Sequence, residues 1–82
     1  MNYIITLKGE VYMRDYAPLW ETMQRKGITT YTLISTYKFS KGTIYRLKHI
    51  QNVNIQTLED LCEILECSIQ DVVKVILHPK SN

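Results

Sequence analysis

The sequence predicts an all-α domain of five short helices that follows an N-terminal arm. Three observations support this fold class. The chain has 82 residues, which is enough for one domain. Its composition is that of a globular protein, with 45% hydrophobic and 22% charged residues. Beyond the arm, apolar residues recur at helical spacing between side chains that are typical of helix ends.

The five predicted helices are short and only a few residues apart. In chain order they cover residues 16–26, 30–37, 41–48, 55–66 and a last segment between Ser68 and Pro79. Each follows or includes a side chain that can accept a hydrogen bond from a first-turn N–H group: Asp15, Thr29, Ser40, Asn54 and Ser68. Helices of two or three turns persist only when they pack against one another, so we expect a compact bundle.

The N-terminal arm differs in character from the helices. Tyr3–Leu7 and Glu10–Tyr12 are rich in strand-forming residues, and Lys8-Gly9 between them is suited to a turn. An isolated two-stranded hairpin is only marginally stable, so we expect the arm to pair with a second subunit. Alternatively, Met13 is the native initiator and the arm results from the choice of start site. The expected organisation is an arm over 1–13, a helical domain over 14–78 and a tail over 79–82.

Charged residues are divided between two parts of the chain. The segment between Thr22 and Leu58 contains six basic residues and no acidic one. Acidic residues then predominate up to Lys74. This division predicts one side that faces a polyanion and another that faces solvent or a partner, although ordinary solvated charge would give the same count.

Residues 30–49 carry most of the functional information, because they form two short helices separated by a tight break. Leu33 and Tyr37 are expected to anchor the first helix on the core, and Phe39 to fill the angle between the helices. Ile44 and Leu47 are expected to seat the second helix so that its opposite face points outward. A helix about 10–12 Å across fits the major groove of duplex DNA.

The outward side of helix 41–48 has side chains suited to DNA. We expect Lys41, Thr43 and Arg46 to contact base edges, because Lys and Arg donate to guanine and Thr can bond a base or touch a thymine methyl group. A second set is expected to contact the phosphate backbone: Thr29, Thr30, Ser40, Tyr45, Lys48 and His49. Gly42 either permits close approach of the helix backbone to DNA or is incidental.

The run from Gly27-Ile28-Thr29 to Lys48, the helix Thr57–Cys67 and then Asp71-Val72-Val73 resemble the Cro and phage-repressor type (Xre-like) helix-turn-helix regulators. The similarity covers roughly Tyr16 to Leu77 and is strongest to the compact, single-domain members. It implies a five-helix lambda-repressor-like fold, double-stranded DNA as the ligand, and a homodimer on an inverted repeat.

Two positions depart from the family pattern. Lys38 stands where the family usually has a left-handed glycine, and Ile34 where it usually has a small alanine. A lysine at positive φ costs about 1 kcal/mol, and Ile34 is expected to push the two motif helices slightly apart. The resemblance therefore leaves the angle of helix 41–48 open.

Other functional classes are disfavoured. The two histidines, His49 and His78, lie on different segments, and there is no glycine-rich phosphate loop, so we expect neither an enzyme nor a cofactor. For a chain of 82 residues we expect no additional domain that senses a small-molecule effector. No apolar run reaches the roughly 18 residues of a membrane span, and no secretion signal precedes the helices, so we expect a cytoplasmic protein.

Cys62 and Cys67 are expected to be reduced core thiols rather than half of a zinc site completed by the histidines.

The acidic helix 55–66 and the apolar segment after it could also serve an alternative function. In that alternative, the fold is a protein-interaction module for a transcription factor, a polymerase subunit or another partner.

Overall fold

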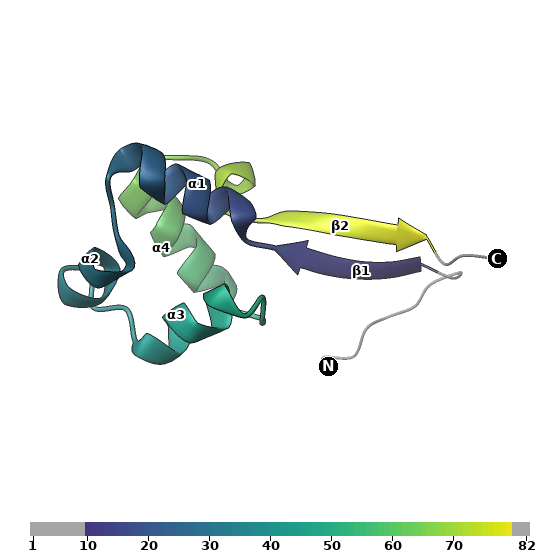
Figure 1. Ribbon diagram of the computed structural model, residues 1–82, viewed down its shortest axis with the longest axis horizontal. Coiled ribbons are helices and arrows are strands. Elements are labelled where there is room, and N and C mark those ends of the chain that lie inside the picture. Colours follow the sequence, from purple (N-terminus) through teal and green to yellow (C-terminus); the bar gives the residue numbers. More distant parts are fainter. Residues whose placement is uncertain (1–9, 80–82) are drawn as a thin grey trace.

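The computed structural model describes residues 10–79, which form a helical body and an antiparallel ribbon that projects from it (Figure 1). The elements in chain order are β1 (Glu10–Asp15), α1 (Ala17–Lys26), α2 (Thr30–Ser35), α3 (Lys41–Lys48), α4 (Ile55–Leu65), the 3-10 turn η1 (Ile69–Asp71) and β2 (Lys74–Pro79). None of the helices in this part of the chain is long and apolar enough to cross a bilayer.

The core lies between the helices, and every helix contributes to it. Its buried apolar side chains are Tyr16, Leu19, Met23, Leu33, Ile44, Leu47, Leu61, Leu65 and Val72. The predicted inward residues Leu33, Ile44 and Leu47 are thus confirmed. Because burial of one such side chain contributes about 1.5–3 kcal/mol, this shared cluster is what holds the short helices in place.

Side-chain caps begin three of the helices as predicted. Thr29, Ser40 and Asn54 each accept a hydrogen bond from the backbone N–H three residues further on, at 3.1, 3.0 and 2.8 Å. At α1 the Asp15 carboxylate accepts from the N–H of Ala17 at 2.9 Å, one residue ahead of the cap position. These bonds satisfy N–H groups that have no partner inside a helix, and this fixes where each helix starts.

The predicted fifth helix is wrong. After Ser68, whose side chain makes no cap bond, the chain forms only the turn η1 and then the strand β2. The segment is rich in β-branched residues, which lose side-chain freedom in a helix and pack well in a strand. Val72 is buried, whereas Val75 is 70% exposed, so apolar character here does not mark the inner face of a helix.

β2 pairs with β1 of the same chain. The register places Glu10 opposite Pro79 and Asp15 opposite Lys74. The predicted strand Glu10–Tyr12 is confirmed and extends to Asp15, but its partner within the chain is the segment predicted as the last helix. The expected strand Tyr3–Leu7 and the turn after it lie outside the described residues.

The helix α2 is shorter than predicted, and this changes the position of Tyr37. The helix ends at Ser35, and Tyr37 lies in the following turn with 44% of its surface exposed. The expectation that Tyr37 anchors the helix on the core is therefore wrong. Leu33 alone is buried from this helix, while Ile34 and Phe39 pack partly against the cluster.

Candidate nucleic-acid interface

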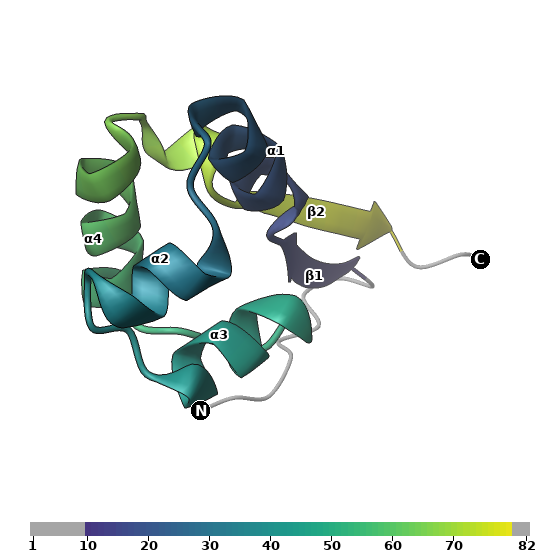
Figure 2. The same ribbon diagram turned by 60° about the vertical axis from the view of Figure 1, so that its left-hand side comes forward.

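The helix α3 lies beside α2 (Figure 2), and one side of it is exposed to solvent. Ile44 and Leu47 point into the core, and at about 100° per residue the opposite side carries Gly42, Arg46 and His49. These three residues are exposed. The structure therefore presents the outward face that the sequence predicts for this helix.

The turn between α2 and α3 has the strained backbone expected at Lys38. Its φ is 64°, in the left-handed region that favours glycine. The next residue, Phe39, donates its N–H to the carbonyl of Leu33 at 3.0 Å, which closes the turn. A lysine thus occupies the conformation that sets the direction of α3.

Replacing Lys38 with glycine is expected to raise the free energy of unfolding by about 1 kcal/mol, because it relieves the left-handed strain. In a domain of this size that corresponds to a rise in Tm of about 4–8 °C. Thermal unfolding followed by circular dichroism measures it. Lys26→Gly, the same change inside the last turn of α1, is the control and should lower Tm. A lower Tm for Lys38→Gly would contradict the prediction.

The side chain of Arg46 lies over Gly42. A Cβ atom added at Gly42 would sit 3.7 Å from Nη1 of Arg46, which is ordinary van der Waals contact. The guanidinium of Arg46 therefore lies near the first turn of α3, the part of the helix that approaches base edges in this motif. The absence of a side chain at Gly42 leaves the flank of that guanidinium open.

Gly42→Ala is expected to raise the free energy of unfolding by about 0.5–1 kcal/mol, because glycine is entropically costly in a helix and nothing blocks the added methyl group. Urea unfolding measures this change. The same variant separates the two interpretations of Gly42. Weaker duplex binding despite higher stability would show that the helix backbone approaches DNA closely, and unchanged binding would show that the glycine is incidental.

Tyr45 and His49 form a stacked pair on the exposed side of α3. Their ring centroids are 3.9 Å apart with 25° between the planes. Nδ1 of His49 lies 2.9 Å from the carbonyl oxygen of Tyr45. Because a carbonyl only accepts, Nδ1 carries the hydrogen in this bond, and Nε2 remains available to another group. The two residues, both predicted to contact the DNA backbone, therefore lie in contact with each other.

Thr29 caps α2, and the remaining predicted site residues line two hollows on the flanks of α3. Thr30, Lys41, Tyr45 and Lys48 line a shallow groove of about 240 Å³ between α2 and α3, with Ile34 and Ile44 at its apolar part. Ser40 and Thr43 lie on the other flank, where their hydroxyl groups are 2.9 Å apart. The structure therefore brings the lysines together and holds the hydroxyl of Thr43 against the cap of its own helix.

Basic residues do not all gather on one face. Arg25 and Lys26 end α1, which lies across the top of the body while α3 lies at the bottom in both views (Figures 1 and 2). The prediction of a single basic side is wrong in this respect. The basic side chains at the exposed helix are Lys41, Arg46 and Lys48, and α3 itself contains no acidic residue.

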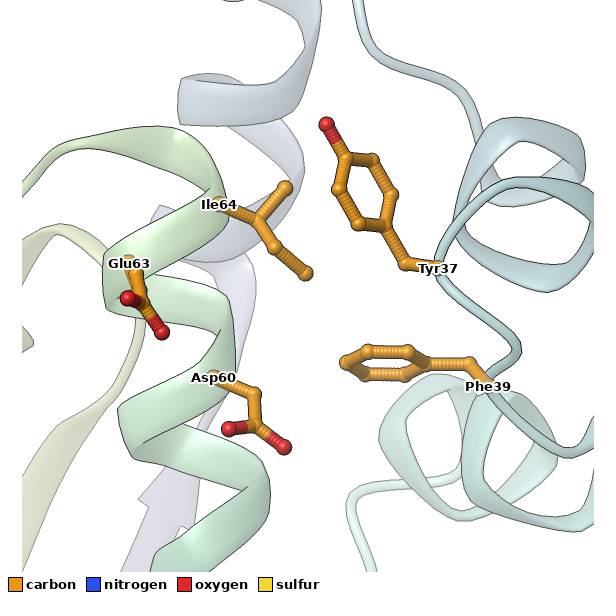
Figure 3. Close-up of a pocket in the computed structure, with 5 residues that line it drawn as sticks. All are labelled: Tyr37, Phe39, Asp60, Glu63 and Ile64. Atoms are coloured by element: carbon orange, nitrogen blue, oxygen red, sulfur yellow. The ribbon is translucent and has the colours of Figure 1, made fainter.

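Acidic residues lie along α4. Figure 3 shows Asp60 and Glu63 of α4 beside a hollow of about 210 Å³ whose walls are Tyr37, Phe39 and Ile64. Asp60 also accepts a hydrogen bond from the amide nitrogen of Gln56 at 2.9 Å. The hollow is bounded by aromatic rings and carboxylates, so its charge is opposite to that of the groove beside α3.

The two cysteines pack against the core, as predicted. Both thiols are free and half-buried, and burial raises the pKa of the Cys67 thiol. Within residues 10–79 no three His, Cys, Asp or Glu side chains gather where they could hold a metal ion.

Sequence reasoning missed two residues that support the end of α3. Arg14 of β1 donates to the carbonyl of Ile50 at 3.1 Å, and the Tyr16 hydroxyl donates to the carbonyl of Gln51 at 2.7 Å. Both partners are more than thirty residues away along the chain. No local pattern marks such contacts.

Comparison with known proteins agrees with this geometry. A model of the Cro/C1-type HTH DNA-binding domain matches residues 18–77. A crystal structure of the transcriptional regulator VanUg superposes with a TM-score of 0.76 at 23% sequence identity, covering 96% of this chain and all of that one. No curated protein sequence matches the chain. The matched region includes the turn at Lys38, the whole of α2, α3 and α4, and all but the first residue of α1, and the chain therefore belongs to the Cro/C1-type helix-turn-helix DNA-binding domain family.

Proposed function

We propose that the protein is a transcriptional regulator that binds double-stranded DNA sequence-specifically, with α3 in the major groove. The observation that carries the proposal is the outward face of α3, which bears Arg46 between flanking lysines and lies opposite the buried Ile44 and Leu47. A helix seated in this way can enter the groove without disturbing the core. The match to a DNA-binding domain family supports the same ligand.

In this proposal the site residues have two roles. Lys41, Thr43 and Arg46 contact base edges, and the backbone is contacted by Thr29, Thr30, Ser40, Tyr45, Lys48 and His49. The protein acts in the cytoplasm as a homodimer on an inverted repeat, as a repressor or autoregulator, with no enzymatic activity and no small-molecule effector. The DNA-binding domain spans 14–78, between the arm 1–13 and the tail 79–82.

Selection of binding sites from a randomised duplex library, at roughly physiological salt, tests this function. Enrichment of an inverted repeat, with half-sites about one helical turn apart, is the expected result. Enrichment of a single half-site would keep sequence-specific binding and remove the dimer. Absence of any enriched sequence, with only weak binding that salt abolishes, would contradict the proposal.

The acidic hollow in Figure 3 favours a second candidate function, that of a protein-interaction module. Aromatic rings beside carboxylates suit an apolar segment that carries Lys or Arg. Charge reversal of Asp60 and Glu63 distinguishes the two functions. The change should abolish regulation through a partner. It should not weaken duplex binding, because the native carboxylates lie on α4 and, being negative, can only repel phosphate.

A further inference from the structure

The C-terminal end of α3 is held by the segment that precedes α1. We infer that Arg14 and Tyr16 are positioning residues for the DNA-contacting helix, an inference that rests on the proposed function of α3. Both residues precede the region that matches the family model, which begins at residue 18.

The helix α3 ends in a Schellman arrangement. The N–H of Gln51 donates to the carbonyl of Arg46 at 2.8 Å, and the N–H of Ile50 donates to the carbonyl of Leu47 at 3.4 Å. This arrangement requires a left-handed residue just after the helix, and that residue is usually glycine. Here it is Ile50, with φ of 58°.

A β-branched residue in this conformation is strained. Such strain persists only where surrounding groups over-determine the backbone. The side chain of Ile50 is 46% exposed, so its own burial is a weak reason for the conformation. The carbonyl groups of Ile50 and Gln51 provide a stronger one.

These two consecutive carbonyls accept hydrogen bonds from Arg14 and Tyr16. The guanidinium of Arg14 gives a charge-assisted bond to Ile50 at 3.1 Å. Tyr16 is 2% exposed and gives the shorter bond to Gln51 at 2.7 Å. A phenol of ordinary pKa, about 10, carries its hydrogen at neutral pH, and burial raises the pKa of the Tyr16 phenol further. We call these two hydrogen bonds the tethers. The tether from Tyr16 is anchored in the core, and the tether from Arg14 is anchored at the base of the ribbon.

The consequence reaches the proposed DNA-contacting residues. The helix α3 has only eight residues, and a helix this short frays readily unless its ends are fixed. The carbonyl of Arg46 accepts the bond from Gln51, so loss of the tethers would loosen the turn that carries Arg46 and His49. Arg14 of β1 and Tyr16, the residue before α1, thus help to position the outward face of α3.

The test uses the full chain with the single variants Arg14→Ala and Tyr16→Phe. Each of them is also combined with Ile50→Gly and, as a control, with Ile50→Ala. Amide hydrogen exchange by NMR in the free protein reports the end of α3. Each single variant removes one hydrogen bond to a carbonyl of Ile50 or Gln51, and this should loosen the turn in which the N–H groups of these two residues are bonded. We therefore expect amide exchange at Ile50 and Gln51 to accelerate about tenfold. Glycine removes the strain, so adding Ile50→Gly should restore protection, whereas Ile50→Ala, which keeps the strain, should not.

Binding to the selected duplex gives the second readout. Affinity should fall about fivefold to tenfold in the single variants and recover with Ile50→Gly, while the dependence on salt stays the same. A salt slope reduced by about one in Arg14→Ala, without rescue, would make Arg14 a phosphate contact and overturn the inference. Unchanged exchange in both single variants would also overturn it. If the wild-type protein binds no duplex, the proposed function fails, and the exchange rates still decide whether the tethers hold α3.

Discussion

Replacing Leu47 with alanine is expected to lower the free energy of unfolding by about 2–5 kcal/mol. Leu47 has no exposed surface and belongs to the cluster that joins all four helices. Truncation removes buried apolar area and leaves a cavity that the short helices cannot close fully. Because domains of this size are only marginally stable, this is a large share of the total.

Urea unfolding followed by circular dichroism measures the effect. Leu58→Ala on α4 is the matched control, because Leu58 is only partly buried and its loss should cost less. Both variants replace leucine in a helix with alanine, so differences in helix propensity are small. A loss below about 1 kcal/mol for Leu47→Ala would show that α3 is not seated by this residue.

Arg46→Ala is expected to reduce affinity for the selected duplex by about 5-fold to 150-fold, which corresponds to about 1–3 kcal/mol for a base-contacting arginine. The guanidinium lies on the outward face of α3, above Gly42. Alanine is a good helix former, so α3 should persist. The loss should be concentrated on one position of the site, where the preference for guanine relaxes.

Fluorescence anisotropy with the selected duplex, and with versions changed at single base pairs, measures both effects. Arg25→Ala is the matched control, since Arg25 is also exposed but lies at the end of α1, away from α3. The affinity of the Arg25→Ala variant for the selected duplex should equal that of the wild type. An equal loss of affinity in the two variants would show that Arg46 contributes only through its charge. No loss of affinity in Arg46→Ala would show that Arg46 does not contact the DNA.

Features that depend on near neighbours could be predicted from the sequence. The helix α3 begins at Lys41 and ends at Lys48 as predicted, because Ser40 caps it and its apolar residues share one face. The same holds for Gly27, whose left-handed φ of 72° ends α1. The strain at Lys38 was expected from the resemblance to family members that have glycine there, and its φ confirms it.

The prediction failed where two signals competed within one segment. Residues 72–77 are apolar enough for a helix and β-branched enough for a strand. Strand formation requires a partner, and that partner is β1, about sixty residues earlier. A helix satisfies its own backbone hydrogen bonds, whereas a strand cannot, so the sequence of the segment alone does not decide between them.

By itself, therefore, the sequence determined the presence of α1, α2, α3 and α4, the side-chain caps of the last three, the inward residues of α3 and the basic character of its exposed side. Only the tertiary structure decided the pairing of β1 with β2, the placement of Arg25 away from α3, and the tethers from Arg14 and Tyr16 to the end of α3. Caps and helical periodicity depend on residues a few positions apart, so they can be predicted from the sequence. The other features arise where distant segments meet, and their energies exist only once the core has brought those segments together.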